Sequence, residues 1–162
     1  MLKVINHSKA SGLDIGLIEK MFHFATNGQL TGDVTINIII GDATLDKLSV
    51  GDYEMQAILY RTPMLNVYSM FIRRRPATSL SGIVFHEATH LLQYESGRLS
   101  MDASMKRCSW EGEEWPASTP YMSRPWEVEA FKEQRRLEKA WRKKEKEDKA
   151  ALKAAKRQTK KK

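Results

Sequence analysis

The residues best suited to chemistry are His86, Glu87 and His90, which form an HExxH motif inside an apolar run from Ile83 to Leu92. Two histidines four residues apart on a helix project from one face, so their imidazoles can converge on one metal ion. The carboxylate of Glu87 can reach a water in the open position of that metal and act as its general base. The motif therefore predicts half of a zinc site together with a catalytic base.

The flanks of the motif favour a buried helix. The stretch contains no proline, and most of its residues are apolar or uncharged. Thr78, Ser79 or Ser81 can cap its start and Gly97 can end it, which gives a helix of roughly 18 residues. The alternative interpretation is a helix whose histidines only pack or form hydrogen bonds.

A third metal ligand is expected elsewhere, because a catalytic zinc usually has three protein ligands and one exchangeable water. The candidate segment runs from Arg124 to Ala130, where Pro125 suits the first turn of a helix. Glu127 and Glu129 lie about 200° apart around such a helix, so only one of them can face the metal. They are therefore alternative third ligands.

An HExxH motif followed by the helical segment Pro-Trp-Glu-Val-Glu-Ala at residues 125–130 resembles the gluzincin group of zinc metallopeptidases. The likeness is to small bacterial and phage minimal zincins with a PxExEA segment, and it covers roughly residues 55 to 131. It implies a zincin-like fold, one Zn²⁺ per chain and Glu127 as the third ligand. The chain lacks the NExxSD form of the third-ligand motif, and Phe131 stands where related groups often have aspartate or asparagine.

Peptide-bond hydrolysis is the function that this reading predicts. With zinc held by His86, His90 and Glu127, Glu87 would take a proton from the metal-activated water and return it to the leaving amine. Tyr121 is a candidate substrate or oxyanion contact, with packing as its ordinary role. The alternatives are a non-catalytic zinc-binding module and a nucleic-acid-associated protein that uses its basic C-terminal residues.

The segments ahead of the motif indicate an α+β fold. Residues Leu13 to Asn27 have the apolar spacing of a helix, while Asp33–Ile40, Tyr53–Arg61 and Asn66–Ile72 predict about three strands in a small mixed sheet packed on the HExxH helix. In zincins the strand before the active helix often forms the upper edge of the cleft, where a peptide can pair with it, and Asn66–Ile72 occupies that place in the chain; the alternative is an ordinary strand of the sheet. The irregular segment Ser96–Arg124 is expected to wall the cleft.

Positive charge is concentrated at the C-terminal end. Residues 131–162 hold 15 Lys or Arg and 5 Asp or Glu, a net of +10, whereas residues 1–130 have a net of −3. We therefore divide the chain into a metallopeptidase domain, residues 1–130, and a basic helical extension, residues 131–162. That extension is either a solvated helix or a contact for nucleic acid or another polyanion. The run Arg73 to Arg75 is either a solvated turn or a patch that steers substrate.

Composition points to one ordinary domain in a reducing compartment. The chain has 162 residues, 41% of them hydrophobic, and its single cysteine, Cys108, excludes an intrachain disulfide and suits packing. Residues Met1 to Ala10 do not predict a signal peptide, and the longest apolar stretch, Val34 to Ile40, is too short to cross a bilayer. We expect a cytoplasmic protein with a peptide or protein substrate and no membrane contact.

Overall fold

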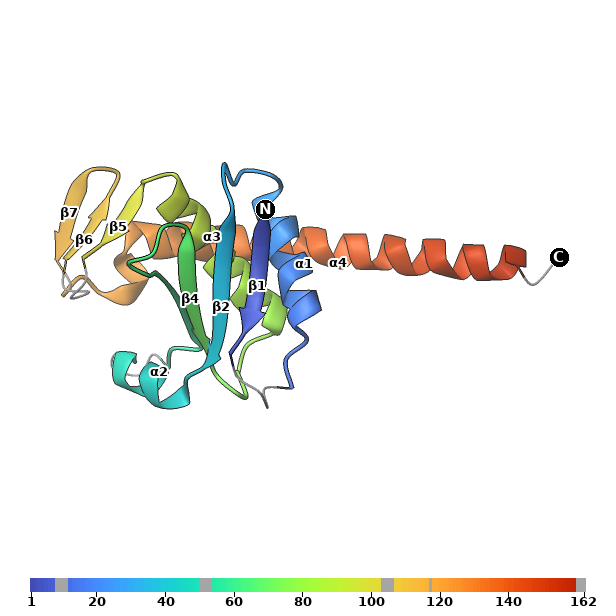
Figure 1. Cartoon of the computed structure of the whole chain (residues 1–162), viewed down its shortest axis with the longest axis horizontal. Coiled ribbons are helices and arrows are strands. Elements are labelled where there is room, and N and C mark those ends of the chain that lie inside the picture. Colours follow the sequence, from blue (N-terminus) through green and yellow to red (C-terminus); the bar gives the residue numbers. More distant parts are fainter. Residues whose placement is uncertain (8–11, 50–53, 103–106, 117, 160–162) are drawn as a thin grey trace.

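The computed structural model describes residues 1–7, 12–49, 54–102, 107–116 and 118–159, which form a mixed α+β structure. Its main sheet has four strands in the order β1-β2-β4-β3 (Figure 1). These are β1 (Leu2–Asn6), β2 (Val34–Ile40), β3 (Ala57–Arg61) and β4 (Val67–Ile72). Strands β1, β2 and β4 run parallel, and β3 runs antiparallel to β4 at one edge.

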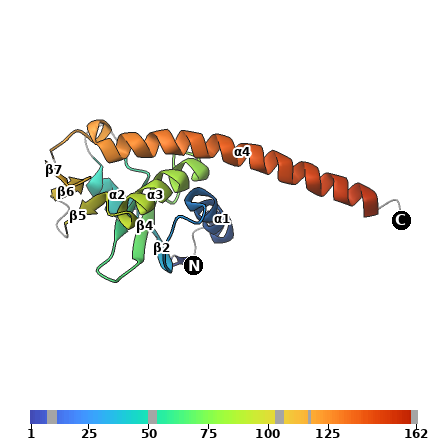
Figure 2. The same ribbon diagram turned by 90° about the horizontal axis from the view of Figure 1, so that it is seen from above.

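Helices cover one side of this sheet. Helix α1 (Ile15–Thr26) and helix α3 (Leu80–Glu95) pack on it, and α4 (Pro125–Thr159) lies across α3, as the view from above shows (Figure 2). The layers meet at an aromatic cluster in which the rings of Phe85 and Trp141 are 6.0 Å apart and Phe24 lies 5.1 Å from Trp141. A shorter helix, α2 (Asp42–Leu48), follows β2.

Helix α3 carries the HExxH motif between the sheet and α4. Ser79 caps its start, with the backbone N–H of Gly82 donating to the Ser79 hydroxyl at 3.1 Å. Gly97 follows its end with a φ of +71°, the left-handed conformation that glycine adopts most easily. The predicted helix and both of its boundaries are confirmed. His86, Glu87 and His90 are all buried, because α3 is covered on both sides.

The expectation of about three strands was too low. Leu2–Asn6 adds a fourth strand to the main sheet by pairing with β2. The segment Ser96–Arg124 was expected to be irregular, but it contains a second, antiparallel sheet of β5 (Leu99–Met101), β6 (Arg107–Trp110) and β7 (Glu113–Pro116), followed by the short 3-10 helix η1 (Tyr121–Ser123). The turn Glu111-Gly112 joins β6 to β7 with both φ angles positive, as in a two-residue hairpin turn of type I′.

The expected position of the edge strand was also wrong. Residues Asn66–Ile72 contain β4, which pairs with β2 on one side and β3 on the other, so β4 lies inside the sheet. The reason is that β3 and β4 form an antiparallel hairpin of which β4 pairs with β2, so β3 becomes the edge strand. The edge that faces α3 is therefore β3.

Arg73 differs from the two arginines that follow it. Its side chain is buried, its Nε donates to the Met55 carbonyl oxygen at 2.7 Å, and its Nη1 lies 2.8 Å from Asp46. Arg74 and Arg75 are exposed. Arg73 is thus neither solvated nor free to steer a substrate, because it ties the segment before β3 to α2.

Helix α4 continues past residue 130 without a break, and its Leu137 and Trp141 belong to the core. Beyond Trp141 no described side chain of α4 is buried, and the helix projects away from the body of the molecule (Figures 1 and 2). Over the described ranges, no helix combines the length and the apolar character that a membrane crossing needs.

Candidate metal centre

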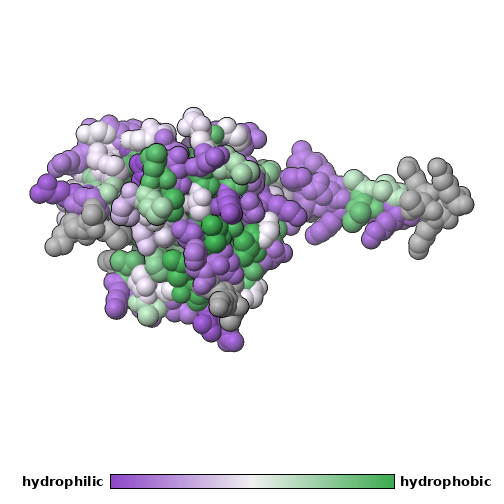
Figure 3. All heavy atoms as spheres, viewed as in Figure 1, coloured by the Kyte–Doolittle hydropathy of each residue, from purple (hydrophilic) through white to green (hydrophobic). Residues whose placement is uncertain are grey.

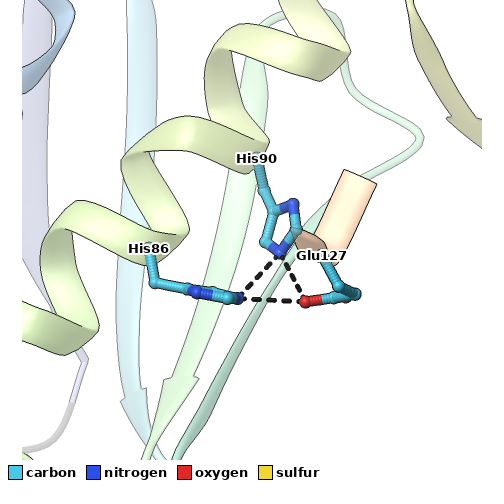
Figure 4. A group of neighbouring side chains, drawn as sticks. All are labelled: His86, His90 and Glu127. Atoms are coloured by element: carbon cyan, nitrogen blue, oxygen red, sulfur yellow. Dashed lines mark hydrogen bonds and ion pairs between the residues drawn. The ribbon is translucent and has the colours of Figure 1, made fainter. Parts of the chain in front are cut away.

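Three buried side chains from two helices converge at one point. His86 and His90 point from α3 toward Glu127, which lies in the first turn of α4 (Figure 4). The two histidine Nε2 atoms are 3.1 Å apart, and Oε2 of Glu127 lies 3.1 Å from Nε2 of His86 and 3.4 Å from Nε2 of His90. The structure therefore brings together the three residues that the sequence predicts as ligands.

The triangle has the size of a metal site. Bonds of about 2.0–2.1 Å in a tetrahedral zinc centre place neighbouring ligand atoms about 3.3 Å apart, and the three observed separations lie close to that value. Two imidazole nitrogens and one carboxylate oxygen are donors that zinc and several other divalent transition metals accept. These residues lie close enough to hold a metal ion.

Gln93 orients one of the histidines. Its Oε1 lies 2.7 Å from Nδ1 of His90, and its Nε2 donates to the carbonyl oxygen of Trp126 at 3.0 Å. An amide oxygen can only accept, so Nδ1 of His90 carries a proton and Nε2 is the nitrogen that would bind a metal in exchange for its own proton. Gln93 also joins the helix of the histidines to the residue that precedes Glu127.

The second histidine has an apolar neighbour instead. The ring of Phe131 meets the ring of His86 edge to face, with 4.7 Å between their centres. Nδ1 of His86 is buried and finds no hydrogen-bond partner in the part of the chain that the structure describes. In the metal-free site Nε2 of His86 donates to Glu127, so a metal at this point would replace the Nε2 proton, and Phe131 supplies packing rather than a hydrogen bond.

Glu87 lies beside the triangle and is held separately from it. Its Oε2 accepts a hydrogen bond from the backbone N–H of Leu59, in the edge strand β3, at 2.7 Å. Burial raises the pKa of Glu87, although the nearby His90 and His86 counteract this. A carboxyl group with a raised pKa takes up a proton more readily, which suits a general base that must later return it.

Charges within the triangle support one another. Burial disfavours ionised Glu127, but His90 and His86 outweigh that effect and hold its pKa below the usual range. Burial likewise opposes protonation of His90, yet Glu127 raises the pKa of His90 to about 9. The site is thus built to place positive charge against the Glu127 carboxylate, which a proton or a metal cation can provide.

Glu129, the alternative third ligand, lies outside the cluster. Its carboxylate oxygens are 2.6 and 3.0 Å from the guanidinium of Arg98, which also pairs with Glu111. Arg98 follows α3 and Glu111 lies in the β6–β7 turn, so this pairing fastens the second sheet to α4. The rotation of α4 that turns Glu127 toward the histidines therefore turns Glu129 toward Arg98.

Two cavities border the centre. The first, of about 230 Å³, is mostly apolar, and the second, of about 210 Å³, is smaller and more polar. Ala57, Glu87 and Tyr121 line both of them, so the cleft extends to either side of Glu87. Tyr121 sits at this shared wall, with its ring packed near Phe131 and with the guanidinium of Arg124 5.6 Å from the ring centre. The first cavity is lined mainly by Leu48, Met55, Tyr94, Leu99, Met101 and Trp126.

Sequence reasoning did not assign the contacts of Gln93 and Leu59. The spacing of Gln93, three residues after His90, places both on one helix face and could have indicated the hydrogen bond. Leu59 acts through its backbone, so its residue type carries no signal. Cys108 is buried in β6, as expected for a packing residue, and burial raises the pKa of its thiol to about 11.

Comparisons of this chain with protein-family models, with curated proteins and with solved structures found no match.

Proposed function

We propose that this protein is a zinc-dependent metallopeptidase with a zincin-like domain. The observation that carries the proposal is the buried triangle of His86, His90 and Glu127, with Glu87 held beside it by Leu59. A structural metal site needs no base next to it, and a buried carboxylate at that position has a cost of desolvation. The pairing of a ligand triangle with an adjacent carboxylate favours hydrolysis.

The residues divide the work as follows. Zinc in a three-ligand site lowers the pKa of a water and polarises a carbonyl group. The hydrogen bond from Leu59 holds Oε2 of Glu87, which leaves Oε1 to take a proton from the attacking water. Glu87 then returns that proton to the amine that leaves. Gln93 keeps the His90 ring in the orientation that this geometry needs.

An extended peptide is the substrate that fits this cleft. The N–H of Leu59 points away from β4, and alternation along the strand places the polar backbone groups of Ala57 and Arg61 on the same free edge. A peptide can add to such an edge by strand pairing. The apolar cavity of about 230 Å³ next to Glu87 suits a hydrophobic substrate side chain.

Metal content and hydrolysis test the proposal together. Elemental analysis of the wild type, Glu127→Ala and Glu129→Ala should give about one zinc per chain in the first and third and much less in the second. The wild type should also cleave a fluorescently labelled, unstructured casein. Failure to bind zinc when it is supplied to the folded wild type would overturn the proposal, and zinc binding without cleavage of casein or of a mixed peptide library would leave a non-catalytic metal-binding module.

A further inference from the structure

From Lys139 onward, helix α4 carries a stripe of positive charge, most of it on the part that projects beyond Trp141. At 100° per residue, six Lys and Arg side chains fall within an arc of about 80° and extend over about 27 Å of helix. We call these residues the basic stripe: Lys139, Arg142, Lys146, Lys149, Lys153 and Arg157. The acidic residues of the same stretch, Glu145, Glu147 and Asp148, fall outside this arc.

The helix does not neutralise its own stripe. Its one short ion pair beyond Trp141, among the described residues, joins Lys144 to Asp148 at 2.8 Å, and Lys143 lies 3.9 Å from Glu147; both of these lysines lie outside the arc. Arg142 has only a long contact of 3.9 Å with Glu138. Among the residues that the structure describes, Lys146, Lys149 and Lys153 pair with no acid. The acidic side chains of this part of the helix therefore lie on its other faces, where two of them contact lysines outside the stripe.

Placing the stripe residues three and four apart stacks like charges. Lys146, Lys149 and Lys153 are neighbours on the helix surface, and each such pair destabilises an isolated helix by a few tenths of a kcal/mol. Packing against the body of the protein does not offset this repulsion, because the described side chains after Trp141 are not buried against it. A partner with regularly spaced negative charge would relieve this repulsion.

We infer that the basic stripe binds the phosphate backbone of double-stranded DNA without reading its sequence. An α-helix is about 10–12 Å across and B-form DNA has a major groove about 12 Å wide, so a projecting helix can enter it and reach phosphates with its cations. Lysines that contact phosphates release counterions and supply affinity without base specificity. Projection from the body leaves the helix accessible to a long duplex (Figure 1).

Other polyanions fit this helix less well. Single-stranded nucleic acid is usually held by stacking on aromatic rings, and the helix has no aromatic residue after Trp141, which is itself in the core. A membrane surface requires a broad apolar face. The space-filling view shows a hydrophilic surface next to the body and a short hydrophobic stretch farther out (Figure 3). In the sequence, Leu152 is the one large apolar residue after Trp141, and its apolar neighbours are alanines.

A charge exchange tests the stripe without changing composition. The variant K146E/E147K/D148K/K149D keeps the net charge and the residues of the wild type, but it places two acids in the basic stripe. Its matched control, K143Q/K144Q, removes two positive charges outside the stripe. Binding of each full chain to a labelled duplex of about two turns is followed by fluorescence anisotropy over a range of salt concentrations, and circular dichroism checks that helix content is kept.

The wild type should bind the duplex with a log–log salt slope of about −5, the value for six phosphate contacts at about −0.9 each. The exchange variant should bind at least about tenfold more weakly and with a slope of about −3 or shallower, whereas the control should stay within about threefold of the wild type. Equal binding by the wild type and the exchange variant would overturn the inference. So would stronger binding to poly-L-glutamate, to oligo-dT or to phosphatidylserine vesicles than to the duplex.

This inference is independent of the proposed hydrolysis. The stripe begins 12 residues beyond Glu127 and shares no residue with the metal centre. Glu87→Gln should therefore bind duplex DNA as the wild type does, and the exchange variant should keep the zinc content of the wild type. Loss of DNA binding in Glu87→Gln would contradict this separation of the two sites.

Discussion

The backbone N–H of Leu59 donates a hydrogen bond to the carboxylate of Glu87 at 2.7 Å, which ties the edge strand of the sheet to the helix that carries both histidines. Glu87 is buried, so its charged form has lost most of its contact with water. The hydrogen bond stabilises that form and fixes the side chain between the two cavities. One contact therefore sets the position of the Glu87 carboxylate relative to the edge strand.

Replacing Glu87 with Gln should abolish hydrolysis and keep the metal. The amide oxygen can still accept from Leu59, so the fold and the ligand triangle should persist, but an amide takes up no proton at neutral pH. We expect kcat on casein to fall by about 10²-fold or more, with about one zinc per chain retained. Activity close to that of the wild type would show that another group is the base.

Local signals made the HExxH helix predictable. Serine caps, the absence of proline and the glycine after Ser96 act within a few residues, and the structure begins and ends α3 where they indicate. Helix geometry predicted that Glu127 and Glu129 point in different directions from α4, but it did not show which of the two faces the histidines. The structure shows the reason for the orientation: Arg98, from a distant part of the chain, pairs with Glu129, and Glu127 is left to face the histidines.

Pairing between distant strands could not be read in the same way. β1 is only five residues long, and what makes it a strand is its parallel neighbour β2, more than 30 residues away. The order of β3 and β4 depends on which of them docks beside β2, a choice made by burial across the whole sheet. Alternation of apolar residues identifies a strand but does not give its place in the sheet.

Gln93→Ala should weaken metal binding although Gln93 is not a ligand. The change removes the acceptor that orients His90 and the side-chain donor that joins α3 to the carbonyl oxygen of Trp126. We expect zinc affinity, measured by competition with a chromogenic chelator, to fall by about 10- to 100-fold. Ser96→Ala, one turn along the same helix, is the matched control, and a fall of similar size there would contradict an orienting role for Gln93.

Arg73→Ala should destabilise the fold, whereas Arg75→Ala should not. Arg73 is buried and bonds to Asp46 and to the Met55 carbonyl, so its loss leaves polar groups unpaired. Urea unfolding should show a loss of about 2 kcal/mol for Arg73→Ala and a change within about 0.5 kcal/mol for the exposed Arg75→Ala. Equal stability of the two variants, with a lower kcat/KM for Arg73→Ala, would instead favour substrate steering.

The metal-free protein should lose stability as the pH rises from about 6.5 to 9. The pKa of His90 is raised from 6.5 to about 9, mainly by Glu127 against the effect of burial, so the folded chain holds this proton more tightly than the unfolded chain. That stabilisation is complete below pH 6.5 and is lost as the pH passes through 9. The raised pKa of Glu87 acts in the same direction. The lowered pKa of Glu127 contributes stability above 4.5, and that part disappears only in acid.

Bound zinc should reverse this trend, because a metal competes with the proton on His90 and binds more tightly as the pH rises. In EDTA, the Tm should fall by about 5 °C between pH 6.5 and 9. The difference in Tm between the protein with stoichiometric zinc and the protein in EDTA should increase over the same pH range. His90→Gln should flatten the EDTA curve, whereas His23→Gln, on the exposed face of α1, should follow the wild type. A Tm that stays level in EDTA would mean that Glu127 and His90 do not share a proton in the metal-free site.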